Sequence, residues 1–268
     1  MTKQPAPEDV RALAERIERR DGAPPLSDQA LSRIAAPGVE GFTVYDGAAL
    51  IGYAQLDGSL LEVAADPEAL DQLFAMVERA AGRVEVWSHG RRSPVAAAAE
   101  SRGYRRDRVL LQLRRPVLPI PEVTLPEGVQ LRAFVPGQDE QDWLEINAAA
   151  FAGHEQGRIG LADLLAREHE AWFDPAGFLL AVQDSSVVGY HWTKIHADGS
   201  GEVYVLGVAP ACQGMGLGKS LLNAGLAHLG AREILLYVDD SNDGAKRLYR
   251  HAGFVDYDVD IQLRSSAA

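Results

Sequence analysis

The pattern of apolar and polar positions predicts strands and helices that alternate along the chain. The stretch FTVYDGAALIGY (42–53) reads as two apolar strands around a polar turn. Between Leu70 and Val77, apolar residues recur at i, i+3, i+4 and i+7, which is the spacing of one helix face. A second apolar helix face begins at Leu217 and ends before Gly230. This order of elements is typical of an α+β fold with a mixed sheet.

The same order of elements occurs twice, which indicates an internal duplication. FTVYDGAALIGY (42–53) matches FLLAVQDSSVVGY (178–190). Further along, VEVWSHGRRSPVAAAAESRGYRRDRVLLQLRR (84–115) matches ILLYVDDSNDGAKRLYRHAGFVDYDVDIQLR (234–264). Chance resemblance is the alternative, but landmarks shared in the same order favour duplication.

A proline-rich stretch separates the two copies. It contains Pro116, Pro119, Pro121 and Pro126. Each proline fixes φ and lacks a backbone donor, so the stretch suits an extended connector. We therefore expect a domain over residues 1–115, a linker over 116–128 and a second domain over 129–268.

Length and composition suit two domains of a soluble protein. The chain has 268 residues, of which 47% are hydrophobic and 24% charged, and a net charge of −12. This charge argues against binding to nucleic acid or to anionic membrane, and we read WSHGRRSP (87–94) as a solvated turn. The charged N-terminus and the absence of a long apolar run predict a cytoplasmic protein. We expect a monomer whose partner is a small molecule.

A glycine-rich loop, QGMGLGKS (213–220), follows an apolar strand and precedes a helix. A P-loop would need glycine at Gln213, and a Rossmann fingerprint would need it at Lys219. The pattern Q-x-x-G-x-G, with Gly216 and Gly218, fits without exception. Amides of such a turn converge with the first N–H groups of the helix, and together they bind an anion. A plain turn that binds nothing is the alternative, although it would need only one glycine.

With Asn242 heading GAKRLYRHAGF, this order of loop, helix and strand resembles the GNAT acetyltransferases. The resemblance implies two tandem GNAT-like acyl-CoA N-acyltransferase domains, each a mixed sheet flanked by helices, of which only the second is catalytic. It also implies acetyl-CoA as co-substrate. The implied coenzyme contacts are Leu206, Gly207, Val208, Gln213, Gly214, Met215, Gly216, Leu217, Gly218, Lys219, Asn242, Asp243, Gly244, Ala245, Lys246 and Arg247.

Further strings are similar to the mycothiol synthase family within this group. They are DGAPPLSDQ (21–29), AFAGHEQG (150–157), GYHWTKIH (189–196), GEVYVLGVAP (201–210) and LYVDDSNDGAKRLYRHAGF (236–254). The similarity implies transfer of acetyl to the cysteinyl amine of cysteinyl-glucosaminyl-inositol, the last step of mycothiol biosynthesis. It places the acceptor between the halves, against Asp28, Glu155, Lys194, Glu202 and Tyr237. Another small amine, or acetyl-CoA sensing without catalysis, are the alternatives.

Two residues of the second half are candidates for proton transfer. An ammonium must lose a proton before it attacks a thioester, and a carboxylate can accept that proton. The resemblance assigns this role to Glu202, which we expect on one strand face with Tyr204 and Leu206. It assigns the general acid to Tyr249. A solvated strand-start glutamate and a core tyrosine are the respective alternatives.

The sequence contains a cysteine and a pair of histidines that do not predict a reactive site. Cys212, the single cysteine, has no recognisable His-Asp partnership and so does not predict a covalent acyl-enzyme. His191 and His196 have no third ligand at a metal-binding spacing, so we expect no metal.

The first half has no counterpart of the glycine loop and reads Ala65-Asp66-Pro67-Glu68 at the equivalent place. We expect these carboxylates to cap their own helix, and the chain to bind one coenzyme.

Overall fold

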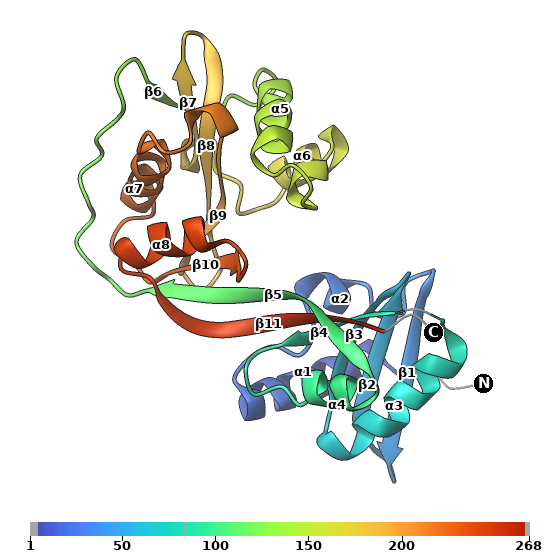
Figure 1. Cartoon of the computed structure of the whole chain (residues 1–268). Coiled ribbons are helices and arrows are strands. Elements are labelled where there is room, and N and C mark those ends of the chain that lie inside the picture. Colours follow the sequence, from blue (N-terminus) through green and yellow to red (C-terminus); the bar gives the residue numbers. More distant parts are fainter. Residues whose placement is uncertain (1–4, 83, 266–268) are drawn as a thin grey trace. The chain divides into compact units, whose positions relative to one another are not determined.

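The computed structural model describes residues 5–82 and 84–265, and it divides the chain into two compact units (Figure 1). The first unit contains the chain up to Leu111, together with Asp239–Ser241 and the residues from Tyr257 onward. The second contains Gln112–Val238 and Asn242–Asp256. Within the described residues, no helix combines the length and apolar character that crossing a bilayer requires.

The first unit is a sheet with helices on both faces. Its elements are α1 (Pro7–Asp21), α2 (Asp28–Ser32), β1 (Val39–Asp46), β2 (Ala49–Asp57), β3 (Leu60–Ala65), α3 (Pro67–Ala80), β4 (Glu85–His89), α4 (Val95–Ser101), the start of β5 (Tyr104–Arg115) and most of β11 (Val255–Ser265). The strands β1, β2 and β3 form an antiparallel meander, and β4 runs parallel to β3. The sheet is therefore mixed, as the sequence pattern predicts.

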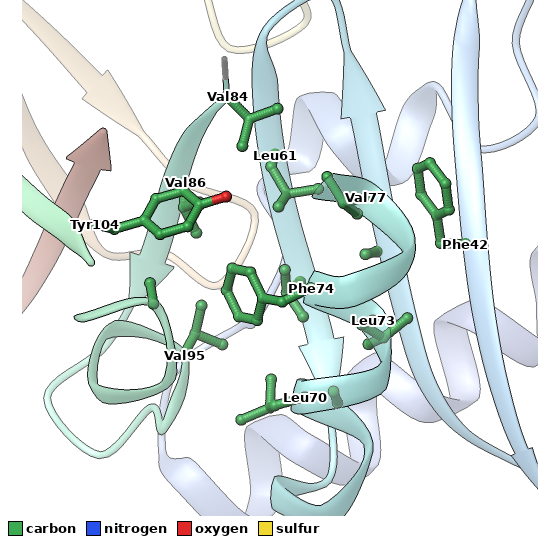
Figure 2. Close-up of a cluster of buried hydrophobic side chains, with 14 of the residues drawn as sticks. Phe42, Leu61, Leu70, Leu73, Phe74, Val77, Val84, Val86, Val95 and Tyr104 are labelled. Carbon is green, nitrogen blue, oxygen red and sulfur yellow. The ribbon is translucent and has the colours of Figure 1, made fainter. Parts of the chain in front are cut away.

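The helix expected around residues 70–77 forms the centre of this unit's core. Leu70, Leu73, Phe74 and Val77 are all buried on the face of α3 that meets the sheet (Figure 2). The ring of Phe74 packs edge-on against Tyr104, with 5.8 Å between the ring centroids. On the opposite face of the sheet, α1 and α2 bury a smaller cluster that includes Leu13, Ile17, Leu26 and Tyr53.

The last strand belongs to the first unit, which corrects the expected boundary of the second domain. Strand β11 pairs antiparallel with β4, from Asp260 opposite His89 to Arg264 opposite Glu85. Leu263 is fully buried in the core around α3. The residues from Gln112 and the proline-rich segment likewise belong to the second unit. Contacts between strands that lie far apart in sequence decide these boundaries, and the proline pattern does not record them.

The second unit repeats the plan of the first. Its elements are β6 (Gln130–Ala133), α5 (Glu140–Ala150), η1 (Gln156–Arg158), α6 (Leu161–Glu168), η2 (Pro175–Gly177), β7 (Phe178–Gln183), β8 (Ser186–Ile195), β9 (Gly201–Val208), η3 (Pro210–Cys212), α7 (Leu217–Leu229), β10 (Ile234–Asp239) and α8 (Asp243–His251). Strands β6 to β9 are antiparallel neighbours, and β10 runs parallel to β9. Figure 1 shows α7 on one face of this sheet, with α5 and α6 on the other.

The hairpins of the two units confirm the internal repeat. Both β1–β2 and β7–β8 are antiparallel and shift register close to the turn, after Val44 and after Ala181. In each hairpin, one glycine allows a helix to pack closely against the sheet. A Cβ on Gly52 would stand 2.8 Å from Ala69 of α3, and one on Gly189 would stand 2.9 Å from Leu221 of α7. Any larger residue at these two positions would push the helix away from the sheet.

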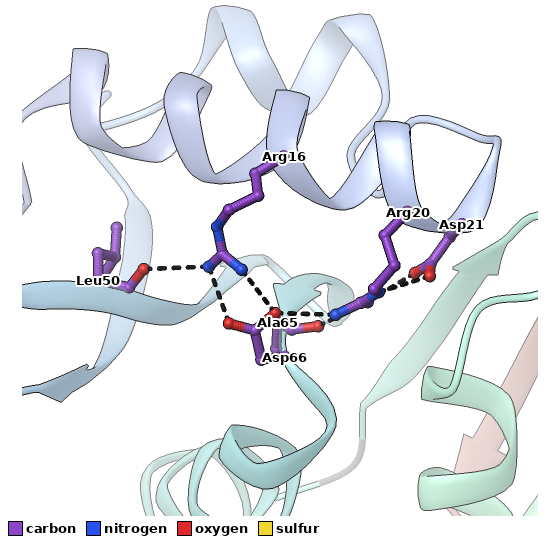
Figure 3. Close-up of polar contacts among 6 residues, drawn as sticks. All are labelled: Arg16, Arg20, Asp21, Leu50, Ala65 and Asp66. Carbon is purple, nitrogen blue, oxygen red and sulfur yellow. Dashed lines mark hydrogen bonds and ion pairs between the residues drawn. The ribbon is translucent and has the colours of Figure 1, made fainter.

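The start of α3 differs from the expected cap. Asp66 occupies the N-cap position, but its side chain makes no capping hydrogen bond. Its carboxylate instead accepts hydrogen bonds from Arg16 and Arg20 of α1, each at 2.8 Å (Figure 3). Two guanidinium groups bind a carboxylate more strongly than backbone amides at an exposed helix end do. The expectation that Asp66 caps its own helix is therefore wrong.

A buried ionic cluster joins β3, β4 and β11 in the first unit. His89 lies between two carboxylates, with Nε2 3.2 Å from Glu62 and Nδ1 3.4 Å from Asp260. Glu62 also accepts hydrogen bonds from the backbone and hydroxyl of Ser27. Residues 87–89 thus end a strand, which corrects their assignment to a solvated turn. Burial lowers the pKa of His89, but the two carboxylates outweigh it and raise this pKa from 6.5 to about 9.

This cluster predicts that the first unit loses stability in alkali. Because the folded-state pKa of His89 lies above its ordinary value, the stabilisation is complete below pH 6.5 and disappears as the pH rises through about 9. The shift corresponds to about 3 kcal/mol. Hydrogen exchange of β4 and β11 amides should report this loss between about pH 6 and pH 10. A His89→Gln variant with the same pH dependence would contradict the prediction.

Candidate active site

Strands β9 and β10 part soon after they begin, which opens the sheet of the second unit. Ile234 pairs with Gly201 and Leu235 with Glu202. No further ladder between the two strands occurs in the part of the chain that the structure describes. The edge of β9 beyond Glu202 is therefore available to an extended ligand that carries amide groups.

A bulge in β9 decides which side chains face each side of this opening. Thr193 pairs with Val203 but Trp192 pairs with Val205, so Tyr204 is the extra residue. Tyr204 packs with the aromatic cluster under α5, whereas Leu206 packs with Leu217 and Leu221 of α7. Glu202 and Tyr204 thus share a face, as expected, but the expectation that Leu206 lies on it is wrong.

The glycine loop follows β9 and ends at the N-terminus of α7. Gly214 and Gly216 adopt positive φ angles of 79° and 85°, which favour glycine. The N–H groups of Lys219 and Ser220 donate to the carbonyl of Gly216. The amides of Leu217 and Gly218 therefore lie at the open end of the helix, where anions bind.

A cavity of about 270 Å³ lies beside this loop. It is lined by Glu122, Thr124, Leu125, Pro126, Met215, Gly216, Lys219, Ser220 and Asn223. The proline-rich segment forms one wall because α7 binds it. Asn223 Nδ2 donates to the carbonyl of Glu122 at 2.9 Å, and the hydroxyl of Ser220 donates to the carbonyl of Thr124. The segment predicted as a linker is thus part of the wall of this cavity.

Glu202 lies at the point where β9 and β10 part. Only 7% of it is exposed, and its Oε2 is 2.8 Å from Nε2 of His196. Directly opposite on β8 stands Lys194, whose ammonium lies 4.9 Å from the ring centre of Trp172 and 5.8 Å from that of Tyr204. A carboxylate and a cation held over aromatic rings therefore face the same side of the sheet.

Tyr249 lies on α8 and is buried, with 7% exposed. Its ring packs edge-on against Phe254, with 5.9 Å between the ring centroids. Burial raises the pKa of Tyr249 to about 12, so the phenol keeps its proton at neutral pH. Burial also raises the pKa of Tyr190 on β8, and the nearby Tyr249 adds to this effect.

The remaining predicted residues have defined places in the fold. Asn242 caps α8, as expected, because its Oδ1 accepts a hydrogen bond from Ala245 at 3.0 Å. The side chain of Gln112 donates to the hydroxyl of Tyr237 at 2.7 Å. Glu155 precedes η1 in the second unit, and Asp28 begins α2 in the first. Near Arg247, the ammonium of Lys246 pairs with Asp243 at 3.1 Å.

A buried network that the sequence pattern does not reveal holds the loop around Glu155. Asn147 of α5 accepts hydrogen bonds from the hydroxyl of Tyr190 at 2.6 Å and from Gln156 at 3.0 Å. Asn147 Nδ2 in turn donates to the carbonyl of Gln156 at 2.6 Å. A fully bonded network of this kind fixes a loop in one conformation. His191, considered above as a metal ligand, is instead buried against the carbonyl of Leu221.

Comparison with known proteins agrees with this geometry. The model of the acetyltransferase (GNAT) family matches residues 141–254. A solved GCN5-related N-acetyltransferase from Sphaerobacter thermophilus is 27% identical, with a TM-score of 0.75 over 98% of this chain and 94% of that one. A tandem GNAT protein from the clavulanic acid pathway is 16% identical and has a TM-score of 0.69, with 98% and 95% covered. The fold is therefore that of a tandem GNAT acetyltransferase.

Sequence relatives narrow this class. The mycothiol acetyltransferase of Thermomonospora curvata is 47% identical over 274 aligned positions, which cover 96% of this chain and 92% of that protein. The mycothiol acetyltransferase of Streptomyces coelicolor is 42% identical, with 96% and 90% covered. The chain belongs to the mycothiol acetyltransferase family.

Proposed function

We propose that this chain transfers acetyl from acetyl-CoA to the cysteinyl amine of cysteinyl-glucosaminyl-inositol, the precursor of mycothiol. One observation carries the proposal. The carboxylate of Glu202 is held almost buried where β9 and β10 part, opposite Lys194. An amine acceptor needs such a carboxylate, and the open edge of β9 suits the amides of a pantetheine arm.

The coenzyme is proposed to lie along β9 and to end at the glycine loop. Backbone groups of Leu206 and Val208 complete a ladder with the pantetheine amides. The amides from Gly214 to Gly218 and the cation of Lys219 hold the diphosphate at the start of α7, where a helix favours negative charge. Residues 242–247 at the start of α8 supply the remaining contacts, because Asn242 and its neighbours are matched to the family motif.

The reaction proposed for this opening uses Glu202 as the base and Tyr249 as the acid. Glu202 accepts a proton from the ammonium of the acceptor, and the neutral amine then attacks the thioester carbonyl. The carbon–sulfur bond breaks as the amide forms, and Tyr249 donates its proton to the departing thiolate. The second proton that the nitrogen loses passes to the phenolate of Tyr249 and restores it, and Glu202 releases its proton to water. With its pKa raised to about 12, Tyr249 remains protonated until the thiolate develops beside it.

The role of Tyr249 is testable by removal of a single oxygen. Tyr249→Phe keeps the ring and its packing against Phe254 but cannot donate a proton. We expect kcat to fall by about 10²-fold, because a positioned general acid contributes at least that much. The Kd for acetyl-CoA, measured by calorimetry, should change by less than twofold. A variant with normal kcat would remove Tyr249 from the mechanism.

Acceptor binding is proposed to use polar side chains matched to the family. The residues proposed are Asp28, Glu155, Lys194 and Tyr237. An acceptor rich in hydroxyls forms hydrogen bonds with carboxylates, with a phenol and with an ammonium, and these groups provide all three. The network around Asn147 supports this role because it fixes the loop that carries Glu155.

The proposed function is tested with a panel of amines and acetyl-CoA, by measurement of released CoA thiol. Cysteinyl-glucosaminyl-inositol should give a kcat/KM at least about 10³-fold above those of amino acids or aminoglycosides, since buried polar contacts reject acceptors that lack the matching hydroxyls. A better rate with another amine would assign the chain a different acceptor. Absence of turnover with every amine would indicate a coenzyme sensor.

A further inference from the structure

The contact between His196 and Glu202 is the feature of this site that the reaction above does not explain. His196 directly follows β8, and Glu202 is the second residue of β9. Nε2 of the ring lies 2.8 Å from Oε2 of the carboxylate. The histidine side chain is 30% exposed and the glutamate side chain 10%. This is a short, partly buried hydrogen bond beside the proposed reacting atoms.

The chain fixes the backbone on both sides of this contact. The N–H of His196 donates to the carbonyl of Ser200 at 2.9 Å, and the N–H of Gly199 donates to the carbonyl of His196 at 2.9 Å. The N–H of Gly201 donates to the carbonyl of Glu233 at 2.9 Å. The turn between β8 and β9 therefore holds the imidazole at a constant place relative to the carboxylate.

The two oxygens of Glu202 have different surroundings. Oε2 accepts the hydrogen bond of His196, whereas Oε1 has no hydrogen-bond partner among the described residues. An ionised carboxylate only accepts hydrogen bonds, so the proton between the two groups belongs to Nε2. This bond is retained when Glu202 takes a proton on Oε1, because Oε2 still accepts. Orientation of the carboxylate is thus maintained in both protonation states.

We propose that His196 is a positioning residue for Glu202, which holds Oε2 and so presents Oε1 alone to the amine of the acceptor. The inference rests on the proposed function, since it takes Glu202 as the base. Without the imidazole, the carboxylate can rotate about its terminal bond and spend time with neither oxygen directed at the amine. A small misplacement of a catalytic group is enough to slow a reaction strongly.

Two substitutions separate positioning from simple packing. His196→Phe keeps a ring of similar size but has no donor, and we expect kcat to fall roughly 10- to 100-fold. His196→Gln keeps an N–H near the position of Nε2 and should restore kcat to within a few-fold of the unchanged protein. The Kd for acetyl-CoA should be constant in both. His169→Phe is the matched control, because the imidazole of that exposed histidine in the same unit bonds, among the described residues, only the carbonyl of Leu165.

A double-mutant cycle with Glu202→Gln decides between the possible outcomes. If His196 acts through Glu202, His196→Phe should have little further effect once Glu202 is Gln. Additive losses, or equal losses in His196→Gln and His196→Phe, would overturn the inference and indicate a structural role. A normal rate in Glu202→Gln alone would instead overturn the proposed base. A normal rate in His196→Phe, with Glu202→Gln impaired, would remove only the role of His196.

Discussion

Replacement of Glu202 by Gln is expected to lower kcat about 10²- to 10⁴-fold at neutral pH, which is the usual contribution of a positioned general base. Gln has nearly the same shape and can still bond to His196, but it cannot accept the proton of the ammonium. The fold should be unaffected because Glu202 lies at the edge of the opening and its backbone pairs with Leu235 and Lys194. Steady-state kinetics with acetyl-CoA and the acceptor measure the effect.

The pH dependence of this loss identifies its cause. As the pH rises towards the pKa of the acceptor's ammonium group, more of the acceptor binds with its amine already deprotonated. Part of the rate should therefore return in Glu202→Gln. Glu170→Gln, an exposed glutamate of the same unit, is the matched control and should be neutral. A kcat for Glu202→Gln equal to that of the unchanged protein at pH 7 would show that another group, or water, accepts the proton.

The features that sequence predicts well here are local. The buried face of α3 is predictable because its four apolar positions have the spacing of one helix face. The cap of α8 is predictable from Asn242 alone. The glycine loop is recognisable in the sequence because the positive φ angles at Gly214 and Gly216 disfavour most other residues at these positions. In each case the physical constraint acts within one or two helical turns, so the chain records it at a fixed spacing.

The features that sequence misses depend on pairing between distant segments. One extra residue in β9 moves Leu206 to the face opposite Glu202, and no single residue type marks such a bulge. The pairing of β11 with β4 assigns the last strand to the first unit. Five residues separate His196 from Glu202, and the turn between β8 and β9 brings their side chains together. Such contacts follow from register, which the pattern of one sequence leaves open.

The two units also differ in how each begins the helix that follows its antiparallel strands. In the second unit, η3 and the glycine loop precede α7 and provide a run of backbone amides. In the first unit, α3 follows β3 after Asp66 alone. The N–H of Asp66 donates to the carbonyl of Ile51, Pro67 has no N–H, and the N–H of Ala69 donates to the carbonyl of Asp66. Few amides therefore remain to bind a diphosphate.

The charges at the start of α3 also disfavour the binding of a diphosphate there. Arg16 and Arg20 bind the carboxylate of Asp66, so a diphosphate would have to displace it from both guanidinium groups (Figure 3). Glu68 adds a further negative charge in the first turn. Like charges about 5 Å apart repel by a few kcal/mol at an effective dielectric near 20, before salt screening. We therefore expect titration calorimetry with acetyl-CoA to give about one site per chain.

Gly216→Trp should abolish this single binding event. Gly216 has a φ of 85°, which residues other than glycine rarely adopt. The indole would also cover the amides of Leu217 and Gly218 at the start of α7.

Gly137→Trp is the matched control, since Gly137 has a φ of 81° with open space around it and lies in the loop before α5. It tests the effect of backbone strain alone and should leave the heat of binding unchanged. Circular dichroism should show that both variants fold. Two sites per chain in the unchanged protein, or tight binding that survives Gly216→Trp in a folded variant, would mean that the first unit holds acetyl-CoA by contacts other than helix amides.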